Sequence, residues 1–184
     1  SDIPMSEIKK KKNCRVCKST RLEKVLSFGP TPLANGFLEP GNRDLPELFY
    51  PLDVYLCEHC GFLQLGHVVS PKLLFKDYVY VSSTSPVFVN HFKKMAEDLF
   101  SRFSLNDESL VIDIGSNDGI LLKPFQTKRV RVLGVEPAKH IAQIARRAGI
   151  PTISDFFGKD LAYKVVAGGG KATLITATNV FAHI

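Results

Sequence analysis

Two apolar segments near the middle of the chain have the pattern of buried β-strands that lead into turns. Residues 111–114 are apolar except for Asp113, and a small-residue turn follows before a new apolar segment begins at Ile120. Residues 132–136 form a second apolar segment, which ends in an acid, Glu136. An apolar strand, a glycine-containing turn, a helix start and a second strand are typical of an α/β domain.

Periodic apolar positions predict two helices beside these strands. Residues 87–103 carry apolar side chains at steps of three and four, which predicts an amphipathic helix with one broad buried face. Pro137 suits the first turn of another helix, whose apolar stripe ends near Gly149. We expect a third strand at 150–154, a loop at the glycines 168–170 and a fourth strand within 172–184.

All the cysteines of the chain occur in two C-x-x-C pairs, Cys14 with Cys17 and Cys57 with Cys60. Two such pairs offer four thiolates, which form the closed tetrahedral shell of structural zinc. Disulfides are the alternative. The start of the sequence has no signal-peptide pattern, so we expect a cytoplasmic protein with reduced thiols.

The segment that contains the cysteine pairs predicts a small subdomain. It is rich in turn formers, such as Gly29-Pro30, and has short apolar strands at 54–56 and 62–65. His59 and His67 are surplus to a four-cysteine shell, so we interpret them as surface or packing residues.

The turn after the first strand indicates a ligand site. A dinucleotide site uses the spacing G-x-G-x-x-G, whereas Asn117 occupies the place of the middle glycine here. Asparagine tolerates a left-handed backbone, and the turn fits better the D/E-x-G-x-G-x-G pattern of class I methyltransferases, which bind S-adenosylmethionine. An ordinary strand–turn–helix without a ligand is the alternative. A carboxylate at the end of the second strand can accept hydrogen bonds from two ribose hydroxyls. The predicted cofactor-binding residues here are Asp113, Gly115, Ser116, Asn117, Gly119 and Glu136.

The ends of the third and fourth strands supply further candidates. Asp155 and Phe156 suit an adenine ring, with the carboxylate on its amino group and the next backbone N–H on a ring nitrogen; a helix N-cap at Asp155 is the alternative. In doubly wound sheets, ligands lie at the carboxyl ends of the strands. We therefore expect Asn179, Val180 and His183 to face the cofactor and substrate crevice.

Composition limits the possible partners. A chain of 184 residues that is 45% hydrophobic holds one or two globular domains, and no apolar run is long enough to span a membrane. The net charge is +6, and residues 1–24 account for five of these six charges. We interpret Lys9–Lys12 as part of a solvated tail. Because the chain has no Trp and no basic–aromatic interleaving, we do not expect an RNA partner.

The order of these features resembles one group of proteins. The cysteine pairs precede a YxYxSSxS segment that begins at Tyr78, and the DIGSNDG turn, Glu136 and a strand ending in Asn179-x-x-x-His183 follow. This order is similar to the zinc-containing class I methyltransferases that include the C-methyltransferases of nucleotide-linked deoxysugars. The resemblance implies a Rossmann-like α/β sheet with an N-terminal zinc-binding subdomain. It also implies S-adenosylmethionine and structural Zn²⁺ as cofactors.

The resemblance further implies a reaction. A base removes a proton beside a keto group of the sugar, and the enolate carbon takes the methyl group. Family members place the base in a C-terminal half, so we expect this chain to be truncated after the fourth strand: a shortened chain, a proteolytic product or a broken gene. His183 is a candidate base or orienting residue, with a helix cap as the alternative. Tyr78 and Tyr80 are candidates for substrate contact, or they pack the zinc module on the sheet.

We therefore predict four parts. They are a disordered basic tail (1–12), a zinc-binding subdomain (13–70), a connecting segment with a helix (71–106) and the N-terminal half of a methyltransferase domain (107–184). The expected substrate is a small molecule, a nucleotide-linked sugar, with no membrane partner. The exposed edge of the fourth strand invites pairing with another copy. The alternative function is a non-enzymatic zinc module with an adenosyl-binding remnant, which binds a protein or nucleic acid through its basic start.

Overall fold

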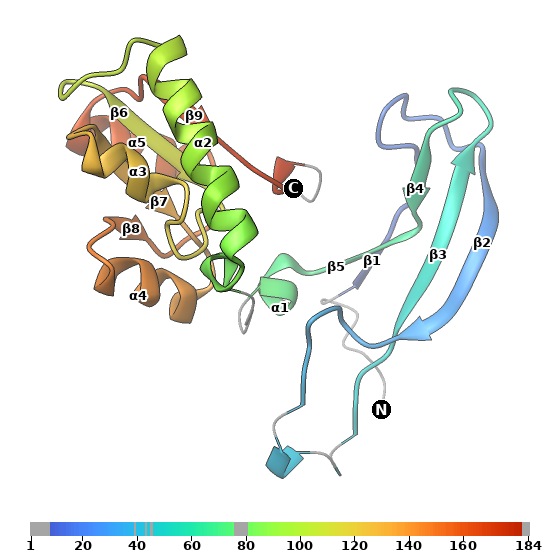
Figure 1. Cartoon of the computed structure of the whole chain (residues 1–184). Coiled ribbons are helices and arrows are strands. Elements are labelled where there is room, and N and C mark those ends of the chain that lie inside the picture. The colour runs from blue at the N-terminus through green and yellow to red at the C-terminus, as the bar shows by residue number, and fades with distance from the viewer. Residues whose placement is uncertain (1–7, 39, 43, 45, 76–80, 182–184) are drawn as a thin grey trace. The chain divides into compact units, whose positions relative to one another are not determined.

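The computed structural model describes residues 8–38, 40–42, 44, 46–75 and 81–181. The chain divides into two compact units, Ser1–Lys76 and Asp77–Ile184 (Figure 1). Among the described residues, no helix combines the length and the apolar character needed to cross a membrane.

The first unit is built on antiparallel strands. Its elements are β1 (Ile8–Lys10), β2 (Leu22–Thr31), η1 (Pro40–Asn42), β3 (Tyr50–Cys57), β4 (Leu63–Leu65), β5 (His67–Val69) and α1 (Pro71–Phe75). One sheet has the order β2-β3-β4, and β1 pairs with β5 (Figure 1). The helix α1 belongs to this unit.

The disorder predicted for residues 1–12 is wrong for residues 8–10. They form β1, in which Ile8 lies opposite Val69 and Lys10 opposite His67. A lysine-rich sequence is ordered here because β5 provides partners for its backbone N–H and C=O groups. The strand β2 also contains Gly29-Pro30, which predicted a turn. A register shift against β3 between Ser27 and Pro30 accommodates this dipeptide as a bulge.

The second unit is a parallel sheet flanked by helices. Its elements are η2 (Ser82–Thr84), α2 (Pro86–Arg102), β6 (Leu110–Ile114), α3 (Leu122–Thr127), β7 (Arg131–Val135), α4 (Lys139–Arg147), β8 (Thr152–Ile153), α5 (Lys159–Gly169) and β9 (Leu174–Thr176). The strand order is β8-β7-β6-β9, and all three pairings are parallel. This sheet confirms the predicted α/β fold class.

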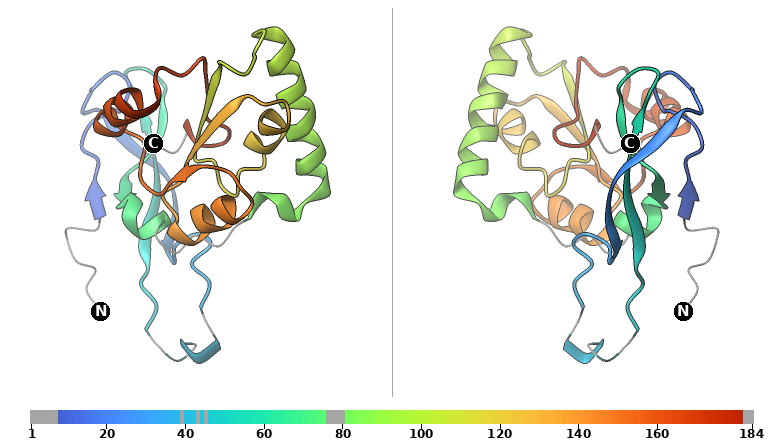
Figure 2. Two further views of the ribbon diagram at one scale, coloured as in Figure 1. Left: turned by 90° about the vertical axis from the view of Figure 1, so that its left-hand side faces the viewer. Right: turned by 90° about the vertical axis from the view of Figure 1, so that its right-hand side faces the viewer.

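Alternation along the central strand builds a core on each face of the sheet. Val111 of β6 packs in one cluster with residues of α2, α3 and α4, while Leu110 and Ile112 pack in another with Leu161 and Val165 of α5. Successive side chains of a strand point to opposite faces, so one apolar run serves both cores. Figure 2 shows α2 and α3 on one side of the sheet and α5 on the other.

The strand order reverses beside β6. Successive strands β6, β7 and β8 extend the sheet in one direction, and the chain then returns to place β9 on the other side of β6. This reversal is the point at which open α/β sheets bind ligands, outside the carboxyl ends of the strands. The fourth strand β9 also lies at a sheet edge, as expected.

Two glycines with the same backbone conformation allow the effect of backbone strain on stability to be measured separately from the effect of packing. Gly119 and Gly149 have φ of +83° and +82°, but a Cβ at Gly119 would lie 2.9 Å from Cγ1 of Ile150, whereas a Cβ at Gly149 would meet nothing within 4 Å. We predict that Gly149→Ala lowers the free energy of unfolding by about 1 kcal/mol, and that Gly119→Ala lowers it by about 3 kcal/mol. Denaturant titration of both variants measures the difference, and equal losses would contradict the packing at Gly119.

Candidate functional site

The two cysteine pairs lie on turns with the same hydrogen-bond pattern. In the first, the N–H of Lys18 donates to the carbonyl of Cys14, and the N–H of Cys14 donates to the carbonyl of Ser19. In the second, the N–H of Gly61 donates to the carbonyl of Cys57, and the N–H of Cys57 donates to the carbonyl of Phe62. Both turns need a left-handed residue at the fifth position, which Lys18 (φ 64°) and Gly61 (φ 74°) supply.

The turns bring the four sulfur atoms together. The Sγ atoms of Cys14 and Cys60 are 3.7 Å apart, those of Cys17 and Cys57 are 3.5 Å apart, and all four lie within 4.8 Å of one another. Ligands about 2.3 Å from one zinc ion lie about 3.8 Å apart at the corners of a tetrahedron. None of the four cysteines is in a disulfide. The donor set therefore fits Zn²⁺, with every tetrahedral position taken by sulfur.

One buried side chain that the sequence analysis did not identify supports this centre. Gln64 of β4 is 6% exposed; its Oε1 accepts the N–H of Arg15 at 2.8 Å, and its Nε2 donates to the carbonyl of Asn13 at 3.2 Å. Backbone N–H groups of Cys17 and Val16 lower the pKa of the Cys14 thiol to about 6, which favours the thiolate that zinc binds. A polar position in the apolar strand 62–65 was the only sequence signal for Gln64.

In the second unit, the carboxylate of Glu136 connects the glycine turn to the end of β7. Its Oε2 accepts the N–H of Asn117 at 3.0 Å, and its Oε1 accepts the N–H of Ala138 at 2.8 Å. Glu136 is 6% exposed, and burial raises its pKa while these two N–H donors oppose the shift. Each carboxylate oxygen still has acceptor capacity, since an ionised carboxylate offers about four lone-pair sites.

Left-handed residues shape the turn. Asn117 has a φ of 50°, which is compatible with its position at the middle glycine of the methyltransferase pattern. Gly115 has a φ of +66°, and a Cβ there would collide with the side chain of Val180, after β9. Val180 therefore packs against the turn. The neighbouring Asn179 is exposed and also left-handed, with a φ of 55°.

Asp113 lies buried inside the sheet. It is 2% exposed, and Oδ1 accepts a hydrogen bond of 2.7 Å from the hydroxyl of Thr176 on β9. Burial is the main cause that raises the pKa of Asp113 to about 7; Thr176 opposes this shift and the nearby charge of Glu136 adds to it. Asp113 thus joins β6 to β9 beneath the turn.

The segment before α2 also attaches to the turn. The N–H of Ser82 donates to Oδ1 of Asn117 at 2.9 Å, and the N–H of Ser83 donates to Oδ2 of Asp118 at 3.0 Å. Two successive turn side chains thus hold two successive backbone groups of the YxYxSSxS segment. The sequence pattern does not predict this contact, because it joins positions 35 residues apart.

Two buried polar atoms of the turn have no hydrogen-bond partner among the described residues, Oγ of Ser116 and Oδ1 of Asp118. The Ser116 hydroxyl faces β7, where a Cβ at Gly134 would collide with it. A turn with such atoms and an acceptor carboxylate beside it fits a polar ligand.

The remaining predicted residues have different outcomes. Asp155 is exposed, and its Oδ1 accepts the N–H of Phe156. The N-cap of α5 is Gly158, so the alternative of a helix N-cap at Asp155 is wrong. Contact of Asp155 and Phe156 with an adenine ring stays a prediction. The three predicted catalytic residues, Tyr78, Tyr80 and His183, lie outside the described residues.

Both units match known protein families. Residues 14–75 match a family described as "Putative zinc binding domain", and residues 89–184 match a family described as "Methyltransferase domain". The second match covers more than half of the chain. The chain belongs to the methyltransferase domain family.

The chain is also similar to a curated relative. It is 36% identical over 171 residues to a protein of Streptomyces niveus named C-methyltransferase NovU. That alignment covers 93% of this chain and 41% of the relative, so the chain spans well under half of the relative's length.

The two family matches indicate a cofactor for each unit. A methyltransferase domain implies S-adenosylmethionine. The four-cysteine cluster and the zinc-binding family support Zn²⁺. The predicted cofactors are confirmed at this level.

The metal centre gives a prediction with an internal control. We expect about one zinc ion per wild-type chain, and Cys60→Ser should weaken zinc binding at least about 100-fold, because it removes one of four ligands. His59→Asn should leave zinc binding unchanged, since the exposed His59 is surplus to the shell. Metal analysis and competition with a chelator measure both effects. A wild-type chain with reduced thiols and no zinc would contradict the assignment.

Asp113 gives a prediction about pH. Its pKa is about 7 in the folded chain against 3.8 ordinarily, so between these values the folded state binds the additional proton. Its contribution to the free energy of unfolding therefore falls as pH rises from about 4 to about 7, by up to about 1.4 kcal/mol per pH unit. Asp113→Asn should remove this contribution, whereas Asp107→Asn at an exposed position should not. Denaturant titrations at pH 5.5–8 test it, and a wild-type pH slope in Asp113→Asn would refute the shift.

Proposed function

We propose that the protein to which this chain belongs transfers a methyl group from S-adenosylmethionine to a carbon atom of a nucleotide-linked keto sugar. The observation that carries the proposal is the pairing of Asn117 with Glu136. It places an acceptor carboxylate at the end of β7, directly beside the glycine turn at the end of β6. The name of the Streptomyces relative supports carbon as the methyl acceptor.

Residues of the second unit have separate roles in this proposal. Glu136 accepts hydrogen bonds from the ribose hydroxyls through the acceptor capacity that its two backbone contacts leave. The turn Gly115–Gly119 provides close backbone approach to the amino-acid part of the cofactor. Asp155 and Phe156 bind the adenine ring, and Asn179, which is exposed and follows β9, also contacts the cofactor.

The bound cofactor supplies an electrophilic methyl group. The protein must therefore create a nucleophilic carbon: a base removes the proton beside the keto group, and the enolate carbon forms the new C–C bond. We assign substrate contacts to Tyr78 and Tyr80, and a role in proton transfer or substrate orientation to His183. The serine contacts at Asn117 and Asp118 support this assignment for the tyrosines, because they fix residues 82 and 83 on the cofactor turn.

The zinc unit has a structural role in this proposal. Four sulfur ligands leave no position for substrate or water, so the metal orders the turns around it instead of entering the reaction. Within the two units we assign zinc binding to residues 13–70 and the methyltransferase half to residues 107–184; residues 71–106, between them, contain α1 of the first unit and α2 of the second. Reduced thiols as ligands support a cytoplasmic location for the protein.

The ribose contact can be tested on the ligand and on the protein together. We predict that the zinc-loaded chain binds S-adenosylhomocysteine with micromolar affinity, and that its 2′,3′-dideoxy analogue binds at least about tenfold more weakly, as expected for lost hydrogen bonds to a carboxylate. Glu136→Ala should bind the two ligands equally, because the carboxylate that distinguishes them is gone. Isothermal calorimetry measures the four affinities.

The control for this cycle is Glu97→Ala on the exposed face of α2, which should retain the wild-type preference. Glu136→Ala also leaves two backbone N–H groups without their acceptor, so its fold is verified by the denaturation midpoint. A folded Glu136→Ala variant that still prefers S-adenosylhomocysteine would contradict the role of Glu136.

A further inference from the structure

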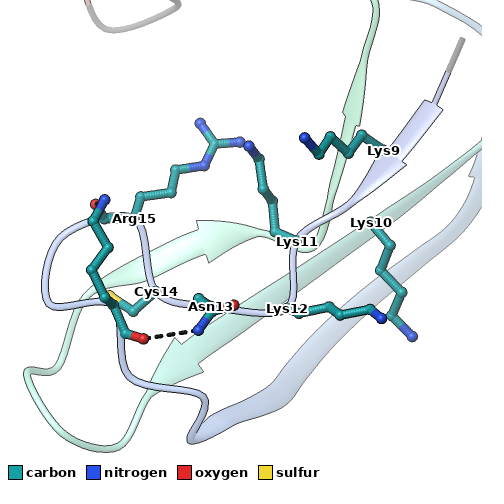
Figure 3. A pocket seen from close by; sticks show the side chains of 8 residues that line it. Lys9, Lys10, Lys11, Lys12, Asn13, Cys14 and Arg15 are labelled. Atoms are coloured by element: carbon teal, nitrogen blue, oxygen red, sulfur yellow. Dashed lines mark hydrogen bonds between the residues drawn. The ribbon is translucent and has the colours of Figure 1, made fainter. Parts of the chain in front are cut away.

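A pocket on the first unit lies outside the site described above. It has a volume of about 470 Å³ and is next to the zinc centre, because Cys14 forms part of its wall (Figure 3). Its lining contains six basic side chains and no acidic one; the complete lining is Lys9, Lys10, Lys11, Lys12, Asn13, Cys14, Arg15 and Lys18.

The basic charge of this pocket is poorly compensated. The ion pairs among the described residues involve Arg21, Lys24 and Arg102, and none of the six cations of the pocket. Of these cations, Lys18 donates to a backbone carbonyl, that of Arg15, at 2.8 Å. Zinc with four thiolates carries two net negative charges, which is less than the positive charge of six cations.

The backbone that carries these cations is ordered rather than a free tail. Lys9 and Lys10 lie in register with β5, and the N–H of Lys11 donates to the carbonyl of Gly66 at 2.7 Å. The N–H of Arg15 donates to Gln64. In Figure 3 the head groups of Lys11 and Arg15 point toward one another. Because like charges repel, this arrangement costs free energy unless an anion lies between the two head groups.

The size and the lining of the pocket favour a small anion over nucleic acid. A volume of about 470 Å³ is in the range of small-molecule sites. None of the lining residues is aromatic, so the pocket has no surface on which bases can stack. Lysine and arginine together bind phosphate oxygens through several charge-assisted hydrogen bonds, and adjacent phosphates engage more of them than one phosphate does.

We propose that this basic pocket binds the diphosphate group of a small phosphorylated molecule, such as a nucleoside diphosphate. The choice of a nucleoside diphosphate rests on the proposed function, whereas the binding of the diphosphate group does not. The zinc centre then has a second effect, since it fixes the turn that holds Arg15 and Lys18 at the pocket.

The test is a calorimetric titration of inorganic pyrophosphate into the full zinc-loaded chain. We expect saturable binding of one pyrophosphate per chain, at least about tenfold tighter than inorganic phosphate. The double variant Lys11→Gln/Arg15→Gln should bind pyrophosphate at least about tenfold more weakly. The control Lys93→Gln/Lys94→Gln removes the same charge from the exposed face of α2 and should bind like the wild type. No saturable binding, or an equal loss in the control, would overturn the proposal.

A second measurement covers the case in which Lys11→Gln/Arg15→Gln fails to hold zinc. In the wild-type chain, pyrophosphate should protect Lys9–Lys12 from chemical acetylation while Lys93 and Lys94 react as before, as read by mass spectrometry. Equal reactivity with and without pyrophosphate would refute the site.

Two further probes separate this proposal from others. A nucleoside diphosphate should compete with pyrophosphate, and single-stranded RNA should bind no more tightly than pyrophosphate does at 150 mM salt. Tighter RNA binding that the double variant abolishes would overturn the proposal in favour of a nucleic-acid surface. S-adenosylhomocysteine binding is measured on the same sample, so loss of the cofactor site and loss of this pocket are distinguished.

Discussion

The candidate site of the second unit depends on the carboxylate of Glu136. It is nearly buried, and its two oxygens each accept one backbone N–H, from the glycine turn after β6 and from the chain after β7. Removing the carboxylate would leave one buried donor, at Ala138, and one part-buried donor, at Asn117, without this acceptor, at a cost of up to about 1–3 kcal/mol for each group. The same acid therefore holds the turn in shape and presents acceptor sites beside it.

Interactions around Glu136 extend this arrangement to the neighbouring elements. Asp113 and Thr176 join β6 to β9 through a hydrogen bond, and Val180 packs on Gly115 of the turn. Asn117 and Asp118 use their side chains to hold the backbone of Ser82 and Ser83. The turn is thus fixed by three segments from distant parts of the sequence. Such preorganisation lowers the cost of ordering a loop when a ligand binds.

Local patterns predicted the parts of this fold that need no distant partner. The apolar runs at β6 and β7 and the periodic face of α2 follow from residues close in sequence, and so do the C-x-x-C turns. The helix α5 was missed because its last turn contains Gly168 and Gly169, which resemble a loop. Packing of Leu161 and Val165 on the sheet outweighs the low helix propensity of these glycines.

Other features depend on long-range pairing and could not be predicted. The strand β1 has the composition of a solvated tail, and its partner β5 lies almost sixty residues later in the chain. The hydrogen bonds of Gln64, Thr176 and Ser82 likewise join residues far apart in the sequence. The glycine turn and Glu136 could be assigned to one site because a strand-ending acid at this spacing is part of a known pattern.

The most direct test of this account is an NMR titration of the ¹⁵N-labelled, zinc-loaded chain with S-adenosylhomocysteine. If the turn, Glu136 and the segment after β9 form the cofactor site, the amide resonances of Asn117, Ala138 and Val180 will shift until one equivalent of ligand is bound, while that of Gln64 in the zinc unit will remain unchanged. Saturable binding that leaves the Asn117 and Ala138 resonances in place would contradict the account, because the ligand would then occupy a different site.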